Sequence, residues 1–355
     1  MPSYAITGEE IQAAFKKAAS WNTAVAAGAG DGILLLPMKV KRDAPINVDD
    51  SLGQFFTVDG TPGAVKLDGD LPGYMRYDSL DPLLALFMGV AGAPTQQGLT
   101  DAYAYTYKWA QHIDGLFGTL VKNMVNYIEE VATLKIIGIT IKGQGGAKPL
   151  EFSLKVIGDN KVQDSAVNTL VTFANVTYPE KKNRIRYSEG VFRMNDQSGI
   201  ALAAGDKIYP SSFELTAQRK LKGEYTGQYT VTKGSNTQDL IDEPTNDGGV
   251  DISLKLSFPK HSAATYLTDL GEDARKKMDI VFTGAQIIAP YNRQFMLQLP
   301  HLQLKSDDVT DAKGKIVEPL EFVVHAAETA PAGMAGITDP FWITGINKRT
   351  TDPLA

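Results

Sequence analysis

Short stretches in which apolar and polar residues alternate recur along the whole chain. This period of two is typical of β-strands that bury one face. Glycine, proline and asparagine separate the stretches, as they do where strands turn back. The pattern predicts a mainly β protein, an antiparallel sandwich or barrel with a few short flanking helices. The clearest runs are Tyr103–Trp109, Phe152–Val156, Phe213–Ala217, Ile252–Phe258 and Leu320–Val324, with Phe341–Ile343 a weaker one.

Helical patterns are confined to three places. Capping-box spacing before an apolar face predicts a helix over residues 8–20. A second helix is expected to begin with Asp81 as its N-cap carboxylate and proline in its first turn, and to end at Gly89. The segment Ala263–Lys277 has the composition of a broken helix. These helices would flank the strands and would not form a layer of their own.

The apolar positions change parity at Pro300. Phe295, Leu297 and Leu299 are odd-numbered, whereas Leu302 and Leu304 are even-numbered. A strand keeps its apolar side chains on one face through such a change only if one extra residue bulges out. The sequence therefore predicts a β-bulge at Pro300.

The chain divides into three regions by composition. Residues 1–40 are expected to form an amino-terminal helix and arm, and residues 41–73 a long loop or extended hairpin rich in proline, glycine and aspartate. Residues 74–355 are expected to form the β-rich domain. Two segments, Thr133–Gly158 and Phe213–Phe258, share a strand, turn, strand plan, which allows an internal duplication of about 74–205 and 206–355.

Composition excludes several classes of function. The 355 residues carry 35 Lys plus Arg against 41 Asp plus Glu, a net charge of -6, which disfavours tight binding of nucleic acid. There is no cysteine, so disulfides, thiolate nucleophiles and cysteine-bound metals are excluded. The first residues lack the pattern of a secretory signal, so synthesis in the cytoplasm is expected. The apolar runs are too short to span a bilayer, so no membrane insertion is expected.

Catalytic, cofactor and metal signatures are weak. The four histidines have no metal-site spacing along a helix, although His301 and His325 would supply half a metal site if their strands paired. The glycine-rich segment Gly143–Pro149 is followed by a strand, so it predicts a hairpin turn and not a phosphate loop. We therefore expect no catalytic residues, no cofactor and no metal. A glycoside hydrolase with two catalytic carboxylates stays open as an alternative, because the sequence does not give the distance between two acidic side chains.

Aromatic residues are candidates for a subunit interface. Tyr103, Tyr105, Tyr107 and Trp109 fall on one face of one strand, which suits packing into a core or against another subunit. Such a row also suits stacking on sugars or bases. Phe55 and Phe56 are adjacent within the polar segment 41–73, where exposed aromatics indicate a partner surface.

Four stretches together resemble the tail tube proteins of long-tailed phages. They are Gly73–Gly89, Tyr127–Gly158, Ile208–Leu215 and Gln294–Ala326, in the order that the family shows. The resemblance implies a structural virion protein, located in the phage tail. Six copies, or their pseudo-sixfold equivalent, would form rings stacked into a tube through which DNA leaves the capsid. The implied partners are further copies, other tail proteins and DNA passing without specific contacts, and the loop carrying Phe55 and Phe56 would reach toward the next ring.

Two alternatives stay open at this point. One is another virion component, such as a capsid or shell protein, which would need more helix than the pattern predicts. The other is a carbohydrate-binding or carbohydrate-active β-sandwich that uses the row Tyr103–Trp109.

Overall fold

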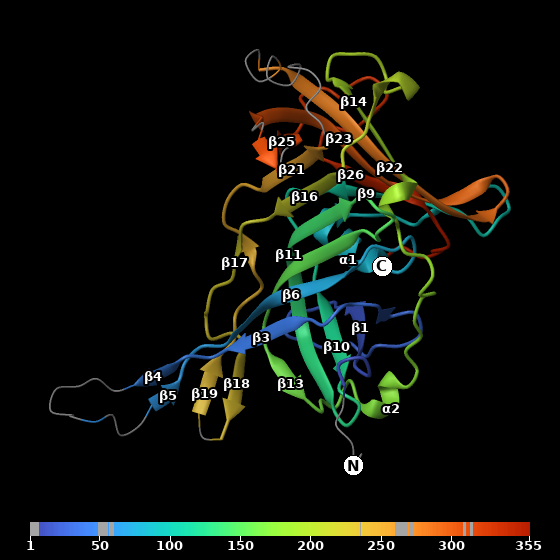
Figure 1. Cartoon of the computed structure of the whole chain (residues 1–355). Helices are drawn as coiled ribbons and strands as arrows, with labels where there is room; N and C mark the ends of the chain where they lie inside the picture. The colour runs from blue at the N-terminus through green and yellow to red at the C-terminus, as the bar shows by residue number, and fades with distance from the viewer. Residues whose placement is uncertain are drawn as a thin grey trace.

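The computed structural model describes residues 7–48, 56, 60–234, 236–259, 269, 273–307, 310–312 and 315–355. Twenty strands in this part of the chain belong to one hydrogen-bonded sheet system, and every strand pairing in it is antiparallel. The prediction of a mainly β, sandwich-like fold is confirmed. Over the described residues the sheets stay open and do not close into a barrel (Figure 1).

Eight strands lie side by side through the middle of the molecule, and we call them the eight-stranded sheet. Each neighbouring pair is antiparallel, so the first and last strands run in opposite directions. In spatial order they are β3 (Lys39–Asp43), β6 (Lys66–Tyr74), β12 (Glu151–Gly158), β11 (Ile128–Gln144), β16 (Ser212–Gln218), β21 (Asp251–Phe258), β25 (Lys315–Val324) and β23 (Tyr291–Asp307).

Two long strands, β11 and β23, leave this sheet and continue into flanking sheets. The first half of β11 pairs with β10 on one side and β13 on the other. β23 likewise pairs with β22 on one side, as far as Gln303, and with β26 on the other. The flank of β11 holds β1 (Gln12–Lys17), β2 (Gly32–Ile33), β10 (Gly118–Asn123) and β13 (Lys161–Gln163). The flank of β23 holds β7 (Gly89–Val90), β8 (Thr95–Gln96), β9 (Tyr103–Trp109), β14 (Gly190–Asp196), β15 (Lys207–Ile208), β22 (Arg275–Ile288) and β26 (Trp342–Asn347).

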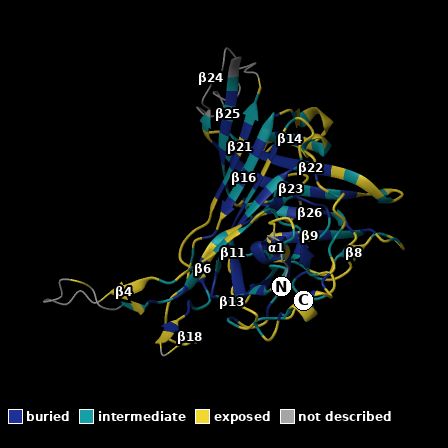
Figure 2. Cartoon of the chain, turned by 60° about the horizontal axis from the view of Figure 1, so that its bottom comes forward, coloured by how far each residue is buried: buried dark blue, intermediate teal, exposed yellow. Residues whose placement is uncertain are grey.

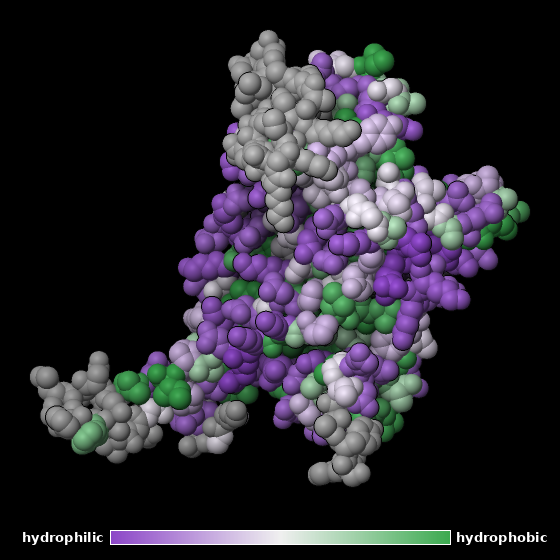
Figure 3. All heavy atoms as spheres, in the orientation of Figure 1, coloured by the Kyte–Doolittle hydropathy of each residue, from purple (hydrophilic) through white to green (hydrophobic). Residues whose placement is uncertain are grey.

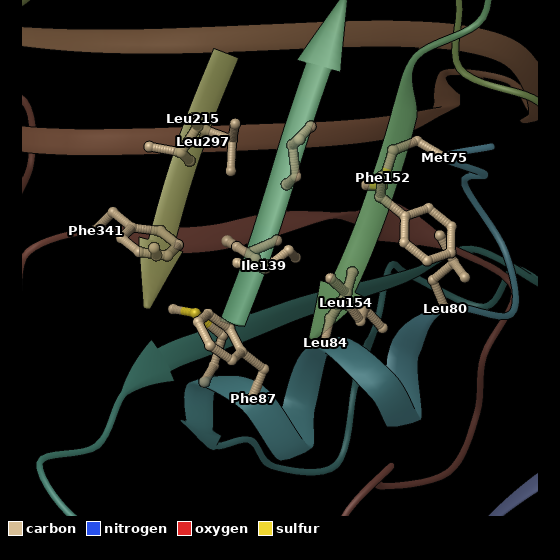
Figure 4. Packing of buried hydrophobic residues seen from close by; sticks show 14 of the residues in the cluster. Met75, Leu80, Leu84, Phe87, Ile139, Phe152, Leu154, Leu215, Leu297 and Phe341 are labelled. Carbon is tan, nitrogen blue, oxygen red and sulfur yellow. The ribbon is translucent and has the colours of Figure 1, made fainter. Parts of the chain in front are cut away.

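Helix α1 (Asp81–Met88) fills the space between the sheets. Its Leu84 and Phe87 point toward Ile139, Leu154 and Leu215 on the inner face of β11, β12 and β16 (Figure 4). The helix ends where Gly89 takes a left-handed conformation (φ 94°) and its N–H bonds to Ala85 O. This helix was predicted correctly, except that Leu80 and not Asp81 is the N-cap. Within the described residues, the other helices with defined bounds are short: α2 (Leu170–Phe173), η1 (Tyr187–Glu189) and η2 (Ala204–Asp206).

Smaller hairpins project from the body. β4 (Ile46–Val48) pairs with β5 (Gly60–Pro62) on an extension that we call the arm, drawn at the lower left of Figure 1. Residues of the predicted loop 41–73 therefore form two antiparallel ladders, β3 with β6 and β4 with β5. Near the end of this segment, Leu67 and Leu71 of β6 are fully buried beneath the eight-stranded sheet. The other small strands are β17 (Leu221–Lys222) with β20 (Thr245–Asn246), β18 (Thr230–Lys233) with β19 (Asn236–Asp239), and β24 (Thr310–Ala312) with β25.

The predicted helix over residues 8–20 is wrong. Thr7 and Glu10 do contact each other, with Thr7 N donating to Glu10 Oε2 at 2.7 Å, but they form only a turn. The next residues form β1, which pairs with β10 on one side and β2 on the other and buries Phe15. Pairing with β10 and β2 on both edges outweighs the local preference for a helix, which is worth only about a few tenths of a kcal/mol per residue.

Two further predictions concern the second half of the chain. Most of the segment Ala263–Lys277 lies outside the described residues, and its last three residues belong to strand β22, so the predicted helix does not reach Lys277. The bulge at Pro300 is confirmed. Leu299 pairs with Met278 whereas Leu302 pairs with Lys276, so β23 holds one extra residue between them.

Candidate assembly surfaces

One face of the eight-stranded sheet is polar, and the other is the core. In β16, Phe213, Leu215 and Ala217 are buried, whereas Glu214 and Thr216 between them are half-buried and lie on the solvent side. β12, β11, β21 and β25 alternate in the same way (Figure 2). We call the solvent side of β6, β12, β11, β16, β21 and β25 the polar face.

Charges alternate in sign across the polar face. The strand registers place five charged residues in one line, and Lys305 joins them through its ion pair with Glu321. We call these six residues the charge row: Glu151, Lys142, Glu214, Lys255, Glu321 and Lys305. Both ends of the row are ion pairs, with Lys142 Nζ 3.1 Å from Glu151 Oε2 and Lys305 Nζ 2.9 Å from Glu321 Oε1. The hydrogen bond from Lys305 lowers the pKa of Glu321. The row is therefore charged but balanced.

Small hydroxyl side chains form the next line on the polar face. Ser153 pairs with Thr140, Thr140 with Thr216, and Thr216 with Ser253, and the two threonine hydroxyls are 3.4 Å apart. Two hollows lie on this face: one of about 720 Å³ around the charge row and one of about 120 Å³ around Thr140. The polar face is thus hollowed and lined by small and charged groups.

The eight-stranded sheet has two open edges. Among the described residues, no strand pairs with β3 on the side away from β6, and none pairs with Leu304–Asp307 of β23 on the side away from β25. Just before β3, Leu34, Leu35 and Leu36 are only half-buried. Open edges present unpaired backbone donors and acceptors, so they are the places where a second chain adds most readily.

The arm carries exposed apolar side chains. Ile46 is 70% exposed, Val48 55% and Phe56 77%. Figure 3 shows hydrophobic residues on the arm, away from the body of the molecule. Phe55 lies outside the described residues. Exposed apolar residues gathered on one projection favour a contact with a partner.

The aromatic row of β9 is buried in the chain's own core. Tyr105, Tyr107 and Trp109 are 6%, 0% and 8% exposed, and only Tyr103 is half-buried. The three buried rings therefore offer no exposed face on which sugars or bases could stack. The carbohydrate-binding alternative, which needed such a face, is not supported by this row. A direct contact of the row with another subunit remains a proposal for Tyr103 alone.

Two buried polar residues, Asp81 and Arg219, hold segments of the core together. Asp81 is 4% exposed and accepts hydrogen bonds from Tyr107 Oη at 2.6 Å and Asn347 Nδ2 at 2.8 Å, and burial raises its pKa. Arg219 donates to the carbonyls of Phe87, Met88 and Ala110, and its guanidinium lies 3.8 Å from the centre of the Trp109 ring. The sequence had marked Asp81 only as a helix N-cap, and for Arg219 the one signal was its place directly after the buried strand β16.

His301 and His325 come together, as pairing of their strands would require. Their ring centres are 5.3 Å apart, and His325 N donates to His301 O. Each ring has its own partner: His301 Nδ1 contacts Ala326 O and His325 Nε2 contacts Gln303 Oε1. In the part of the chain that the structure describes, no three histidines or acids gather as metal ligands would. None of the described helices is long and apolar enough to cross a bilayer.

Taken together, the fold and its surfaces define a β-sheet building block with a polar face and open edges. Residues 8–324 match the family model described as phage tail tube protein, so the chain belongs to that family. It is a structural protein of the phage tail, which confirms the resemblance found in the sequence. A comparison with curated proteins gave no match.

Proposed function

We propose that the chain self-assembles into rings that stack into the tail tube, and that the polar face lines the channel through which DNA passes. The observation that carries the proposal is the polar face itself. It is a broad hollowed sheet surface whose charges alternate in sign, on a chain of the tail tube family.

Alternating charges suit a conduit for DNA. Neighbouring strands are about 4.8 Å apart, which is shorter than the screening length of about 8 Å at physiological salt. The fields of neighbouring lysines and glutamates therefore largely cancel before they reach a phosphate in the middle of a channel. DNA would slide past such a wall without being held, whereas a lysine-only row would bind it.

The other surfaces fit contacts between copies. The open edges of β3 and β23 suit pairing within a ring, and the exposed apolar residues of the arm suit docking on the next ring. The partners are then further copies, other tail proteins and DNA without specific contacts, in a virion part made in the host cytoplasm. Nothing in this role calls for catalysis or a cofactor.

Negative-stain electron microscopy of the purified protein tests the proposal. Rings or tubes with a central channel wide enough for duplex DNA are expected. A protein that stays monomeric at all concentrations, or that forms closed shells, would overturn the proposed function.

A further inference from the structure

His301 and His325 lie directly opposite each other on neighbouring segments of the eight-stranded sheet. β23 and β25 pair at Leu302 and Val324, and the next residues along this antiparallel ladder are the two histidines. His325 N donates to His301 O at 3.0 Å, and the two ring centres are 5.3 Å apart. Leu302 and Val324 face the core, so both imidazoles stand on the opposite side of the sheet.

The hydrogen bond of the His301 ring determines which of its nitrogens carries the proton. Nδ1 lies 3.1 Å from Ala326 O. A carbonyl oxygen only accepts, so Nδ1 is the donor, and in the neutral ring Nε2 keeps its lone pair. Nε2 is buried, and no group in the described part of the chain hydrogen-bonds to it. His301 therefore holds a free electron pair at a buried nitrogen.

The tautomer of His325 follows from a chain of three hydrogen bonds. Arg275 Nη2 donates to Asp273 Oδ2 at 2.9 Å, as expected of an ionised carboxylate. Gln303 Nε2 donates to Asp273 Oδ1 at 2.8 Å, so the amide oxygen of Gln303 is the atom that lies 3.0 Å from His325 Nε2. His325 Nε2 therefore carries the proton, and Nδ1 of the neutral ring keeps its lone pair. Among the described residues, no hydrogen bond reaches that Nδ1.

The surroundings keep the pair neutral without a surplus of positive charge. Burial, together with the neighbouring His301 and Arg275, lowers the pKa of His325. Arg275 opposes a second cation, but its charge is offset by the ion pair with Asp273. Glu328 lines the same hollow of about 790 Å³ as Arg275 and the two histidines. The pair therefore consists of two neutral imidazoles beside one cationic and two acidic side chains.

Two facing imidazoles, each held by a hydrogen bond at its other nitrogen, are the arrangement of histidine metal sites. Two imidazoles on one tetrahedral zinc ion have ring centres about 5 Å apart, given metal–nitrogen distances of about 2.0–2.1 Å. The separation of 5.3 Å in this chain agrees with that geometry. We propose that His301 Nε2 and His325 Nδ1 bind one divalent transition-metal ion of the zinc class. Neutral imidazole suits zinc, nickel and copper, whereas magnesium and calcium prefer oxygen ligands.

The pair alone leaves coordination positions of the ion open. Among the described residues, no third histidine or acid is gathered with the two rings, so water would fill these positions. Arg275 lines the same hollow, and its Nη1 is buried without a hydrogen-bond partner in the described part of the chain. A water on the ion would give this nitrogen an acceptor. The site should bind zinc more weakly than a closed site with four protein ligands.

An ion at this place would tie β23 to the end of β25, beside the bulge at Pro300. It binds the folded chain and not the unfolded one, since only strand pairing brings the two rings together, and so it stabilises the fold. The sequence led us to expect no metal, because it shows neither the strand register nor the tautomers. The site belongs to the single chain and does not depend on assembly into rings.

Equilibrium dialysis of the chain without an affinity tag against Zn²⁺, followed by elemental analysis, tests the site. The unmodified protein should take up one zinc per chain at neutral pH and no comparable amount of Mg²⁺. His301→Gln/His325→Gln should lose this zinc, whereas His112→Gln, at an exposed histidine on another part of the surface, should keep it. Gln303→Ala keeps both ligands but removes the acceptor that orients His325, and should weaken zinc binding about 10- to 100-fold.

Thermal unfolding provides a second readout. Zn²⁺ should raise the Tm of the unmodified protein and of His112→Gln, and should leave that of the double variant unchanged. If the double variant does not fold, anomalous scattering at the zinc edge from crystals of the unmodified protein decides, with a peak between the two rings expected. Equal zinc uptake by the double variant, or only a water between the rings at saturating Zn²⁺, would overturn the inference. The proposed function would stand in either case, because ring formation is tested without metal.

Discussion

Tyr107 donates a 2.6 Å hydrogen bond from its hydroxyl group to Asp81 Oδ1, and both side chains are buried. The bond joins β9 to the first turn of α1, the helix that fills the space between the sheets. Asn347 of β26 donates to the same carboxyl oxygen. Three segments that are far apart in the sequence are therefore fixed at one buried group.

Tyr107→Phe should lower the free energy of unfolding by about 1–3 kcal/mol at neutral pH, because a buried acceptor loses a donor. Tyr209→Phe, at a side chain that is 77% exposed, is the matched control. Denaturant unfolding of both variants measures the effect.

The same pair predicts a pH dependence. Burial raises the pKa of Asp81, so the folded chain takes up this proton more readily than the unfolded chain. The ionised carboxyl costs stability at neutral pH, and the cost is relieved as pH falls toward the ordinary aspartate value. Tyr107→Phe removes a donor that favours the ionised form, so its stability deficit should shrink as the pH is lowered from neutral toward the ordinary aspartate pKa. A deficit that grows on acidification would contradict this.

Arg219→Met should destabilise the fold by about 3 kcal/mol, since three backbone carbonyls lose their donor and Trp109 loses its cation. The neighbouring Lys220, in an exposed ion pair with Asp251, is the control. Lys220→Met should change stability by less than about 1 kcal/mol. Equal effects of the two substitutions would show that Arg219 is not the anchor that its contacts indicate.

Weak DNA binding is expected of the unmodified protein, because the charge row is balanced. The triple variant Glu151→Gln/Glu214→Gln/Glu321→Gln leaves three lysines in the row and should bind duplex DNA more tightly, with a steeper dependence on salt. A control variant with Glu10, Glu180 and Glu328 changed to Gln has the same net charge. Fluorescence anisotropy separates the two. Submicromolar binding by the unmodified protein in 0.15 M salt would argue against the polar face as a channel wall.

Phe55→Ser/Phe56→Ser should leave a folded protein that forms or stacks rings poorly. Phe56 lies on the arm and is 77% exposed, so its removal should cost the isolated chain little. Calorimetry of the monomer and electron microscopy of the assembly are the two measurements. If the variant loses cooperative unfolding while the unmodified monomer is stable, these residues belong to the core and the arm has no docking role.

Several elements of the fold followed from the sequence alone. Three predictions were confirmed: the alternating strands, the helix that ends at Gly89 and the bulge at Pro300. Each rests on a local pattern with which the tertiary packing agrees.

Other features were decided only by the tertiary structure. Residues 8–20 prefer a helix locally, yet β1 forms because β10 and β2 offer pairing on both sides. The row Tyr103–Trp109 alternates whether it faces a core or a partner, and only the position of α1 and β26 shows that it is buried. The charge row likewise depends on six strands in register. A sequence determines which face of a strand is apolar, because that is a property of neighbouring residues. What covers that face depends on other segments, such as α1 and β26 for β9, which only folding brings next to it.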